Sequence, residues 1–308
     1  MYHQLLNNMA LPSVQLAEYL VDKRKILGLF QEFGIVNQAE SCCGTEVAIV
    51  RRREKFQFKC YRCRKRVSVT CKTYLENCRL SFEQLLTTLF CWSHESPVGF
   101  CEFYSGTSRP TSIAWYEFCR NICTNALLER GEAPLGGEGT VVEIDESLFQ
   151  KKRKYHRGSR GVTPGLWVFG LVDRETKEVR LEVVEKRDKD TLLPIIRKNV
   201  RRGTTIYSDD WASYRGLKEE LGVNHFVVTH KKEFKRKLED GTEVHTNTIE
   251  GHWGNIKRKL KFMRGTSREK LPGYLDEYMF RSLIPRDTPF LEHFLRTIAH
   301  QNPPGKLF

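Results

Sequence analysis

The order of strand-like and helix-like segments in the second half of the chain most restricts its fold. β-Branched or alternating apolar runs predict strands at residues 140–149, 165–173, 178–186, 204–209 and 224–230. Helical patterns follow the third, fourth and fifth runs and close the region, at residues 188–200, 212–222, 245–262 and 273–283. The order β-β-β-α-β-α-β-α predicts a mixed α/β layer arrangement.

The first half has a different character. A basic, Cys-rich stretch covers about residues 42–78, and helical patterns cover residues 81–92 and 111–130. Ser81 is a candidate N-cap for the first of these helices. The helices and a short Gly-containing break between them fit either a helix-turn-helix unit or a plain helical bundle. The Gly-rich segment 131–139 then predicts a linker.

The net charge of +13 favours a polyanionic partner. Residues 140–308 carry 34 Lys and Arg against 24 Asp and Glu, and residues 51–66 interleave basic side chains with aromatic ones. Such clusters suit a nucleic-acid backbone. We expect no membrane span and no signal peptide, and ten cysteines without a secretion signal indicate an intracellular protein with reduced thiols.

Three carboxylates stand where elements begin or end. Asp145 lies inside the first apolar strand, Asp209 ends the fourth, and Glu250 begins the helix 245–262. If the first and fourth strands are parallel neighbours, Asp145 and Asp209 lie side by side, and a helix packed across them presents Glu250. Converging carboxylates repel one another unless divalent cations lie between them, and two Mg²⁺ ions held this way serve phosphodiester chemistry.

Glu250 also has a structural interpretation. Asn247 is a candidate N-cap, and Glu250 could reach back to it in a variant of the capping box. Gly251 and Gly254, which flank the carboxylate, either leave room for a substrate backbone or allow tight helix packing.

Six segments in order resemble the Merlin group of DNA transposases and the related bacterial insertion-sequence transposases with an ISXO2-like transposase domain. They are VEIDES, KYHRG (154–158), GLWVFGLVDRETK, SDDWASY (208–214), HTNTIEGHW (245–253) and YLDEYMFR (274–281). The similarity spans roughly residues 140–283. It implies a ribonuclease H-like mixed sheet with flanking helices and a DDE metal triad formed by Asp145, Asp209 and Glu250, with Asn247 in the N-x-x-E position.

The resemblance also implies partners and domains. We expect two Mg²⁺ or Mn²⁺ ions, double-stranded DNA (terminal inverted repeats and target DNA), and a homodimer on DNA. The expected domains are a basic zinc-ribbon-like region at 1–80, a helical DNA-binding region at 81–130, the linker, the catalytic domain at 140–285 and a C-terminal tail at 286–308. The residues expected to contact DNA, besides Asn247, are Lys151, Lys152, Arg153, Lys154, Arg157, Arg160, Lys257, Arg258, Lys259 and Lys261. His230 and His245 flank the triad and either touch phosphate or are structural.

Family members of this kind often begin with a zinc ribbon of two CxxC knuckles. Cys60 and Cys63 form one, whereas Cys42 and Cys43 are adjacent, and Glu40 stands where a knuckle cysteine is expected. Adjacent cysteines rarely aim both sulfurs at one ion. A ligand is then missing or supplied by Cys71. Two alternatives remain: a zinc site, or a degenerate ribbon that keeps its basic hairpin. Cys91, Cys101, Cys119 and Cys123 are expected in the helical core.

The leading hypothesis is a DNA transposase that cuts and joins transposon ends by two-metal hydrolysis and strand transfer. The alternative is a domesticated, non-catalytic DNA-binding protein derived from such an enzyme. A regulatory zinc module with an unrelated α/β domain leaves the three acids unexplained. The expected location is the nucleus in a eukaryote, for which residues 151–154 (KKRK) offer a short basic signal, or the cytoplasm and nucleoid in a bacterium.

Overall fold

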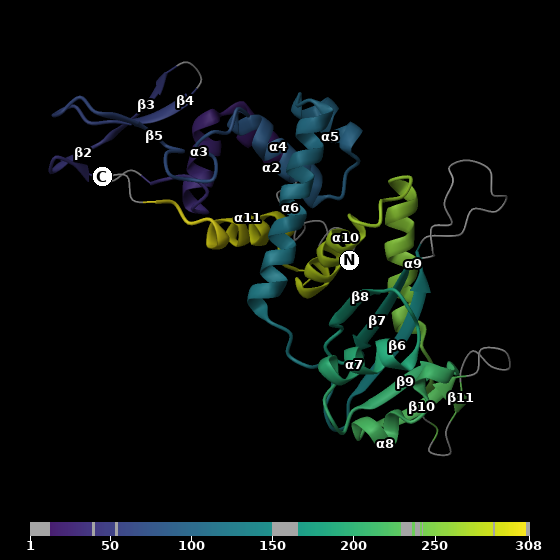
Figure 1. Ribbon diagram of the computed structural model, residues 1–308. Coiled ribbons are helices and arrows are strands. Elements are labelled where there is room, and N and C mark those ends of the chain that lie inside the picture. Colours follow the sequence, from purple (N-terminus) through teal and green to yellow (C-terminus); the bar gives the residue numbers. More distant parts are fainter. Residues whose placement is uncertain are drawn as a thin grey trace. The chain divides into compact units, whose positions relative to one another are not determined.

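A computed structural model describes residues 13–38, 41–52, 55–149, 166–228, 236–237, 241, 243–285 and 287–305. The chain divides into two compact units (Figure 1). The first comprises Met1–Ile122 and Ile284–Phe308, and the second comprises Cys123–Leu283.

The strands of the first unit form two small antiparallel sheets. A hairpin pairs β1 with β2, and a three-stranded sheet has the order β3-β4-β5. The strands are β1 (Ser41–Cys42), β2 (Thr45–Glu46), β3 (Ala48–Arg52), β4 (Lys55–Lys59) and β5 (Arg66–Ser68). Phe56 and Phe58 alternate with polar residues along β4 and are buried. Period-two alternation therefore gives this basic sheet one apolar face.

The helices of the first unit are α2 (Ser13–Val21), α3 (Lys23–Glu32), α4 (Phe82–Ser93), α5 (Val98–Ser105), α11 (Phe290–Gln301) and the first part of α6 (Arg109–Arg130). Ser81 caps α4 as expected, in a capping box with Gln84. The region expected to be a C-terminal tail contains α11, which contacts α4. Phe294 of α11 packs on Trp92, with 4.3 Å between ring centroids.

The second unit is built on a five-stranded mixed sheet of order β10-β9-β6-β7-β8. Its strands are β6 (Val141–Leu148), β7 (Trp167–Asp173), β8 (Val179–Val184), β9 (Thr205–Asp209) and β10 (Asn224–Val228). β6, β7 and β8 are antiparallel neighbours, whereas β9 runs parallel to β6 and β10 parallel to β9. All five strands were predicted. The expected ribonuclease H-like sheet is confirmed.

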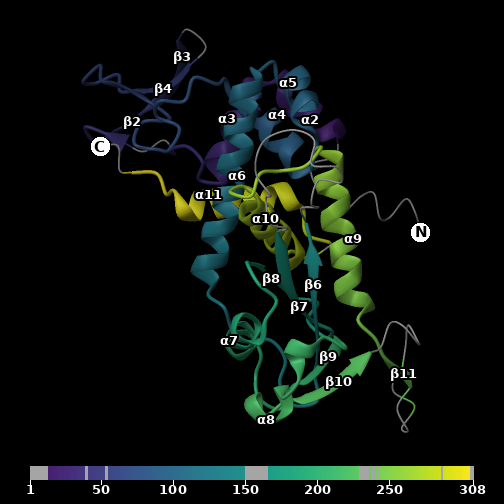
Figure 2. The same cartoon turned by 45° about the vertical axis from the view of Figure 1, so that its right-hand side comes forward.

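Helices cover both faces of this sheet (Figures 1 and 2). One face carries α7 (Lys189–Asn199), the 3₁₀ turn η1 (Ala212–Tyr214) and α8 (Leu217–Leu221), and the other carries α9 (Asn247–Phe262) and α10 (Leu271–Leu283). A short hairpin, β11 (Arg236–Lys237) with β12 (Glu243–Val244), precedes α9. The apolar stripe of α9 is buried as predicted: Ile249, Trp253, Ile256 and Leu260.

The Gly-rich segment expected to be a linker lies along the second unit. Leu135 is buried in the core beneath α7, and its backbone bonds Asn199 and Arg201 on either side of Val200. Gly136 has φ +77°, and a Cβ there would stand 2.5 Å from Oγ1 of Thr204. Glycine therefore allows this segment to lie flat against the fold.

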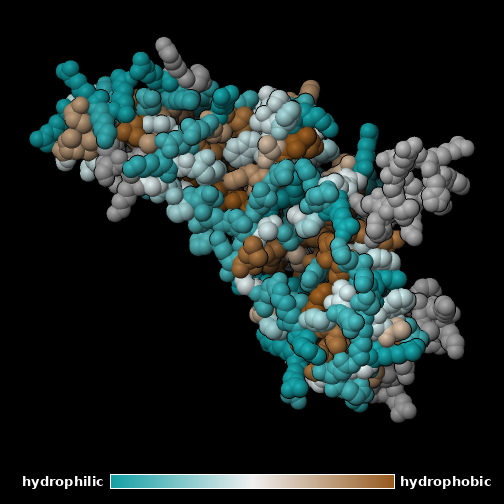
Figure 3. Space-filling view, viewed as in Figure 1, coloured by the Kyte–Doolittle hydropathy of each residue, from teal (hydrophilic) through white to brown (hydrophobic). Residues whose placement is uncertain are grey.

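The visible face of the molecule is largely hydrophilic, with smaller hydrophobic areas (Figure 3). None of the helices in the described part of the chain has both the length and the apolar character needed to span a bilayer.

Candidate active site

Asp145 and Asp209 come from neighbouring parallel strands. The β6–β9 ladder pairs Val141 with Thr205 and Glu143 with Tyr207. The ladder ends at this second pair, and Asp145 and Asp209 each lie two residues beyond it on their strands. Because side chains alternate between the faces of a strand, Glu143, Asp145, Tyr207 and Asp209 all project to the α9 face. The expected parallel pairing of the first and fourth strands is confirmed.

Helix α9 carries Glu250 across this face. Nε1 of Trp253, one turn after Glu250, donates a 2.9 Å hydrogen bond to Oδ2 of Asp145. Gly170, the partner of Asp145 on β7, makes this close approach possible. A Cβ at Gly170 would stand 2.5 Å from Cη2 of Trp253 and 2.9 Å from Cδ1 of Ile249. The missing side chain of Gly170 thus lets α9 lie close above β6 and β7.

The three carboxylates act on one another electrostatically. The pKa of Asp145 is raised to about 6, chiefly by burial and further by the negative charges of Asp209 and Glu250. The hydrogen bond from Trp253 opposes this rise. Like charges raise a carboxyl pKa only when they lie near it. The sheet and α9 therefore bring Asp209 and Glu250 close enough to Asp145 for their charges to act on it.

The acid cluster is wider than a cage for a single ion. Among the described residues, three or more His, Cys, Asp or Glu ligand atoms come within 4.8 Å of one another only at four cysteines. Two ions about 4 Å apart, each with oxygen ligands at about 2 Å, allow outer oxygens up to about 8 Å apart. The donor set contains only carboxylate oxygens, which Mg²⁺ prefers. By its chemistry the donor set suits hard cations.

The capping interpretation of Glu250 is wrong. The N-cap of α9 is Thr246, not Asn247, and its side chain makes no capping bond to the helix. Oγ1 of Thr246 instead donates to Oε1 of Glu250 at 3.0 Å. Gly251 and Gly254 have open space where a Cβ would stand, so tight packing does not explain them. Glu250 itself is exposed.

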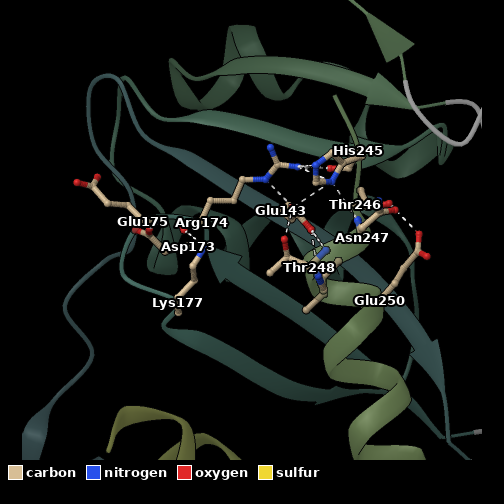
Figure 4. A network of polar contacts seen from close by, with 11 residues as sticks. Glu143, Asp173, Arg174, Glu175, Lys177, His245, Thr246, Asn247, Thr248 and Glu250 are labelled. Carbon is tan, nitrogen blue, oxygen red and sulfur yellow. Dashed lines mark hydrogen bonds and ion pairs between the residues drawn. The ribbon is translucent and has the colours of Figure 1, made fainter. Parts of the chain in front are cut away.

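Two further acids near the triad, the buried Glu143 and the half-buried Glu146, were not singled out from the sequence. Glu143 binds the first turn of α9 from β6 (Figure 4). Glu146 follows Asp145 on the opposite face, where burial raises its pKa to about 7 and Tyr214 opposes the rise. Within the described residues, Oε1 of Glu146 has no hydrogen bond of good geometry. The alternation of apolar and acidic residues in VEIDES was the signal for both.

An arginine–tryptophan stack lies near Glu146. The guanidinium of Arg187 lies 3.6 Å from the ring centroid of Trp167 and 4.3 Å from that of Trp211. The backbone carbonyl of Arg187 accepts a 2.9 Å bond from Nε1 of Trp211. The positive charge of Arg187 lowers the pKa of Glu146. This stack fixes the chain just beyond Asp209.

The basic residues expected to contact DNA divide into three groups. Asn247, Lys257, Arg258 and Lys261 are exposed on α9. Lys259 binds the buried Glu277 at 2.8 Å, a carboxylate that it shares with Arg281, and its contact with DNA stays a prediction. Outside the described residues lie Lys151, Lys152, Arg153, Lys154, Arg157, Arg160 and His230.

A second candidate metal site lies in the first unit, where two hairpin turns meet. The sulfurs of Cys42, Cys43, Cys60 and Cys63 all lie within 4.8 Å of one another. Sγ of Cys42 is 3.7 Å from that of Cys43 and 3.6 Å from that of Cys63. Tetrahedral zinc with Zn–S bonds of about 2.3 Å separates its sulfurs by about 3.8 Å. Four thiols at this spacing fit Zn²⁺.

Adjacent cysteines rarely aim both sulfurs at one ion, and here the backbone explains how Cys42 and Cys43 can do so. Cys43 has φ +57° and the following Gly44 has φ +70°. This left-handed turn brings both sulfurs to one side. Cys71 is not recruited, since its sulfur bonds Oε1 of Glu76 at 3.5 Å. The amide of Cys63 helps to lower the pKa of Cys60, whereas burial and the neighbouring thiols raise the pKa of Cys42.

The other cysteines of the helices behave as predicted. Cys91, Cys101, Cys119 and Cys123 are buried. Cys43 and Cys63 are exposed at their turns.

Comparison with known proteins gives related chains from two organisms. The sequence is 28% identical over 163 residues to an uncharacterized protein in transposable element ISH50 of Halobacterium salinarum, covering 47% of this chain and 53% of that protein. It is 31% identical over 99 residues to an uncharacterized transposase-like protein of Haemophilus influenzae, covering 32% of this chain and 76% of that one. The chain thus spans about half the length of the first relative.

Solved structures with some likeness are retroviral integrase cores. The catalytic core domain of BIV integrase gives a TM-score of 0.29 at 12% identity, covering 44% of this chain and 78% of that one. The HTLV-2 integrase catalytic core in complex with magnesium gives 0.28 at 16% identity, covering 48% and 85%. At these TM-scores the fold assignment rests on the sheet topology described above.

The family comparison covers almost all of the second unit. The ISXO2-like transposase domain matches residues 127–282, which is half of the chain. The match contains β6 to α10 and all three acids of the cluster. The chain therefore belongs to the ISXO2-like transposase domain family.

Proposed function

We propose that this protein is a DNA transposase that cuts transposon ends and joins them to target DNA. The observation that supports it best is the acid cluster. Asp145 and Asp209 each lie two residues beyond the last pair of the parallel β6–β9 ladder, and α9, which carries Glu250, contacts the same face through Trp253. Burial and mutual repulsion make the cluster unfavourable without cations, as the raised pKa of Asp145 indicates.

The cofactor proposed for this cluster is a pair of Mg²⁺ or Mn²⁺ ions held by Asp145, Asp209 and Glu250. Such a pair activates an attacking oxygen and stabilises a leaving oxygen in phosphodiester chemistry. In the cutting step the attacking oxygen belongs to water, and in the joining step it belongs to a 3′-hydroxyl.

The protein's own side chains orient the ligands and the DNA. Trp253 fixes Oδ2 of Asp145, and Thr246 fixes Oε1 of Glu250, so both carboxylates are held before substrate arrives. The exposed Asn247, Lys257, Arg258 and Lys261 give α9 a polar, basic surface suited to phosphates. Residues 151–160 carry further positive charge on the segment between β6 and β7.

The first unit is proposed to recognise terminal repeats. Its β3–β4 hairpin carries the basic residues Arg51, Arg52, Lys55 and Lys59, and α4, α5 and α6 follow it as a helical module. A Zn²⁺ ion bound by Cys42, Cys43, Cys60 and Cys63 would fix the two turns that end this ribbon. A homodimer is proposed because the two transposon ends must be brought together before they are joined to target DNA. The proposed site of action is wherever the DNA lies: the nucleus of a eukaryote or the nucleoid of a bacterium.

Cleavage of DNA that carries the terminal repeats tests the proposal. The repeats are found by inspecting the DNA that flanks the coding region for inverted sequences. Wild-type protein should cut this DNA only with Mg²⁺ or Mn²⁺. Asp145→Ala and Glu250→Gln should abolish cutting and leave the mobility shift of the same DNA close to wild type. Metal-dependent cutting by either variant would contradict the assignment.

The alternative, a domesticated DNA-binding protein without catalysis, is distinguished by the same assay. It predicts a mobility shift with the terminal repeats and no cutting by wild-type protein at any cation concentration. The presence of all three acids in one cluster favours the enzyme, because a protein that only binds DNA gains nothing from acids facing a polyanion.

A further inference from the structure

We propose that Glu143 is a positioning residue: it fixes the first turn of α9 on β6 and so sets Glu250 above Asp145 and Asp209. This inference rests on the proposed function. Glu143 is fully buried, with 0% of its side chain exposed, in a network that joins three separate elements (Figure 4). Isolated burial of a carboxylate is strongly unfavourable, so its partners define its role.

Glu143 is saturated by four donors. Oε1 accepts from Nε of Arg174 at 2.6 Å and from Oγ1 of Thr248 at 2.8 Å. Oε2 accepts from the amides of Thr248 at 2.8 Å and Ile249 at 3.0 Å. A carboxylate offers about four lone-pair positions, and all are used. Glu143 is therefore not a spare metal ligand of the neighbouring cluster.

The two amides belong to the first turn of α9, where no carbonyl of the helix can accept them. A capping side chain normally fills this need, but the N-cap Thr246 directs its hydroxyl to Glu250. Glu143 caps the helix from another strand, and its negative charge suits the positive end of the helix dipole. Because Glu143 accepts from these amides, the hydroxyl of Thr246 can bond Glu250 and orient it.

Arg174 completes the network from the turn after β7. Its Nη2 donates to the carbonyl of His245 at 2.8 Å, just before α9, and to Nδ1 of the same ring at 2.7 Å. Nε2 of the ring lies 3.1 Å from the same Nη2, so Arg174 holds His245 in this network beside Glu143. The guanidinium also lies 4.7 Å from the ring centroid of Tyr207 on β9.

Each acid of the cluster lies two residues after a member of this network. Asp145 follows Glu143 on β6, Asp209 follows Tyr207 on β9, and Glu250 follows Thr248 on α9. Glu143 and Tyr207 are also direct partners in the β6–β9 ladder. The network thus forms a platform next to the acids, and a shift of α9 relative to β6 must break it first.

Glu143→Gln tests the inference, because it keeps the shape and replaces one acceptor oxygen with a donor. The matched control is Glu277→Gln. Glu277 is also buried, and it binds Lys259 near the other end of α9 and Arg281 on α10. Three quantities are measured on the full-length protein: exchange rates of the Thr248 and Ile249 amides, Mn²⁺ affinity without DNA by electron paramagnetic resonance, and the Mg²⁺ concentration for half-maximal cleavage.

Glu143→Gln should speed hydrogen exchange of both amides. It should also weaken Mn²⁺ binding about tenfold or more and raise the half-maximal Mg²⁺ concentration by a similar factor. Loss of a residue that supports a metal ligand typically weakens metal affinity by about 10–100-fold. Glu277→Gln should lose folding stability and keep wild-type metal affinity. A Glu143→Gln protein whose metal affinity stays within about twofold of this control would overturn the inference.

A milder variant, Thr248→Val, covers the case in which Glu143→Gln does not fold. It removes one donor to Oε1 and should weaken Mn²⁺ binding about fivefold, the effect of one hydrogen bond. Unchanged affinity in this variant would also overturn the inference. A different result would contradict the proposed function alone. In that case Mn²⁺ binding by the wild-type protein would depend on Glu143, but the wild-type protein would not cut DNA.

Discussion

The indole Nε1 of Trp253 donates to Oδ2 of Asp145 across the space between α9 and β6. This one bond links the helix that carries Glu250 to the strand that carries the first acid. It also acts on the chemistry of Asp145, because it counteracts part of the rise in the pKa of that carboxyl.

Trp253→Phe should therefore move the acid limb of the pH–activity profile to higher pH. Without the indole donor the pKa of Asp145 rises further, and protonated Asp145 cannot hold a cation. The loss of a hydrogen bond to a charged group should also lower the free energy of unfolding by about 1–3 kcal/mol. The measurement is cleavage rate against pH at subsaturating Mg²⁺. The control is Trp115→Phe, which changes a tryptophan of the first unit and should leave the acid limb of the profile at its wild-type pH. An acid limb at the wild-type pH in Trp253→Phe would show that the indole hydrogen bond does not affect the pKa of Asp145.

Gly170→Ala should displace α9. The new Cβ would overlap the ring of Trp253, which is held in place by its bond to Asp145. Overpacking of this kind costs about 1–3 kcal/mol, and here it should also reduce cleavage strongly. Urea unfolding and cleavage rate are the measurements. Gly251→Ala is the matched control: it meets open space on an exposed helix position and should raise stability by about 0.5–1 kcal/mol. Equal stabilities of the two variants would contradict the packing argument.

Asp145→Asn should stabilise the metal-free protein at neutral pH. The folded protein raises the pKa of Asp145 from 3.8 to about 6, so the ionised side chain disfavours the folded state above that pH. Two pKa units correspond to about 3 kcal/mol, an upper bound for the gain. The gain should shrink as the pH falls below 6 and vanish only below about pH 3, where Asp145 takes up its proton in the folded and the unfolded state alike.

Urea unfolding in the presence of a chelator, at pH 4 and pH 7.5, measures this difference between Asp145→Asn and wild type. Asp210→Asn serves as control, since Asp210 is an exposed carboxylate beside the cluster. Added Mg²⁺ should reverse the order by stabilising wild type alone. A stability difference that does not change with pH would show that Asp145 is not strained by its neighbours.

The cysteine cluster should bind one zinc ion per chain. Substitution with Co²⁺ should give the visible absorption of a tetrahedral thiolate site, and Cys60→Ser or Cys43→Ser should remove it. Cys71→Ser should keep it, because Cys71 bonds Glu76 instead. Removal of zinc should weaken binding to terminal-repeat DNA while leaving the second unit folded. Full absorption in Cys43→Ser would mean that the adjacent cysteines do not both ligate the ion.

Local patterns were enough to predict the sheet and two of the acids. Apolar runs located all five strands, whereas the parallel pairing of the first and fourth strands was only a condition until the family resemblance implied the fold. That pairing alone brings Asp145 beside Asp209. The helix α11 was missed although Leu291, Phe294, Leu295 and Ile298 have helical spacing and are buried.

Other features depend on contacts that the local sequence does not contain. The cap of α9 was misassigned to Asn247 because the true partner of the first amides, Glu143, lies more than a hundred residues earlier. The thiol cluster was doubted because spacing rules ignore the left-handed φ of Cys43. The ion pair of Lys259 was missed because a charge pattern on one helix does not reveal Glu277 on the next.

Titration of the protein with Mn²⁺, followed by electron paramagnetic resonance, tests most directly whether three acids hold two cations. Wild-type protein bound to terminal-repeat DNA should take up two spin-coupled ions. Asp145→Asn, Asp209→Asn and Glu250→Gln should each lose at least one of them. Wild-type uptake of a coupled pair by any of the three variants would contradict the account.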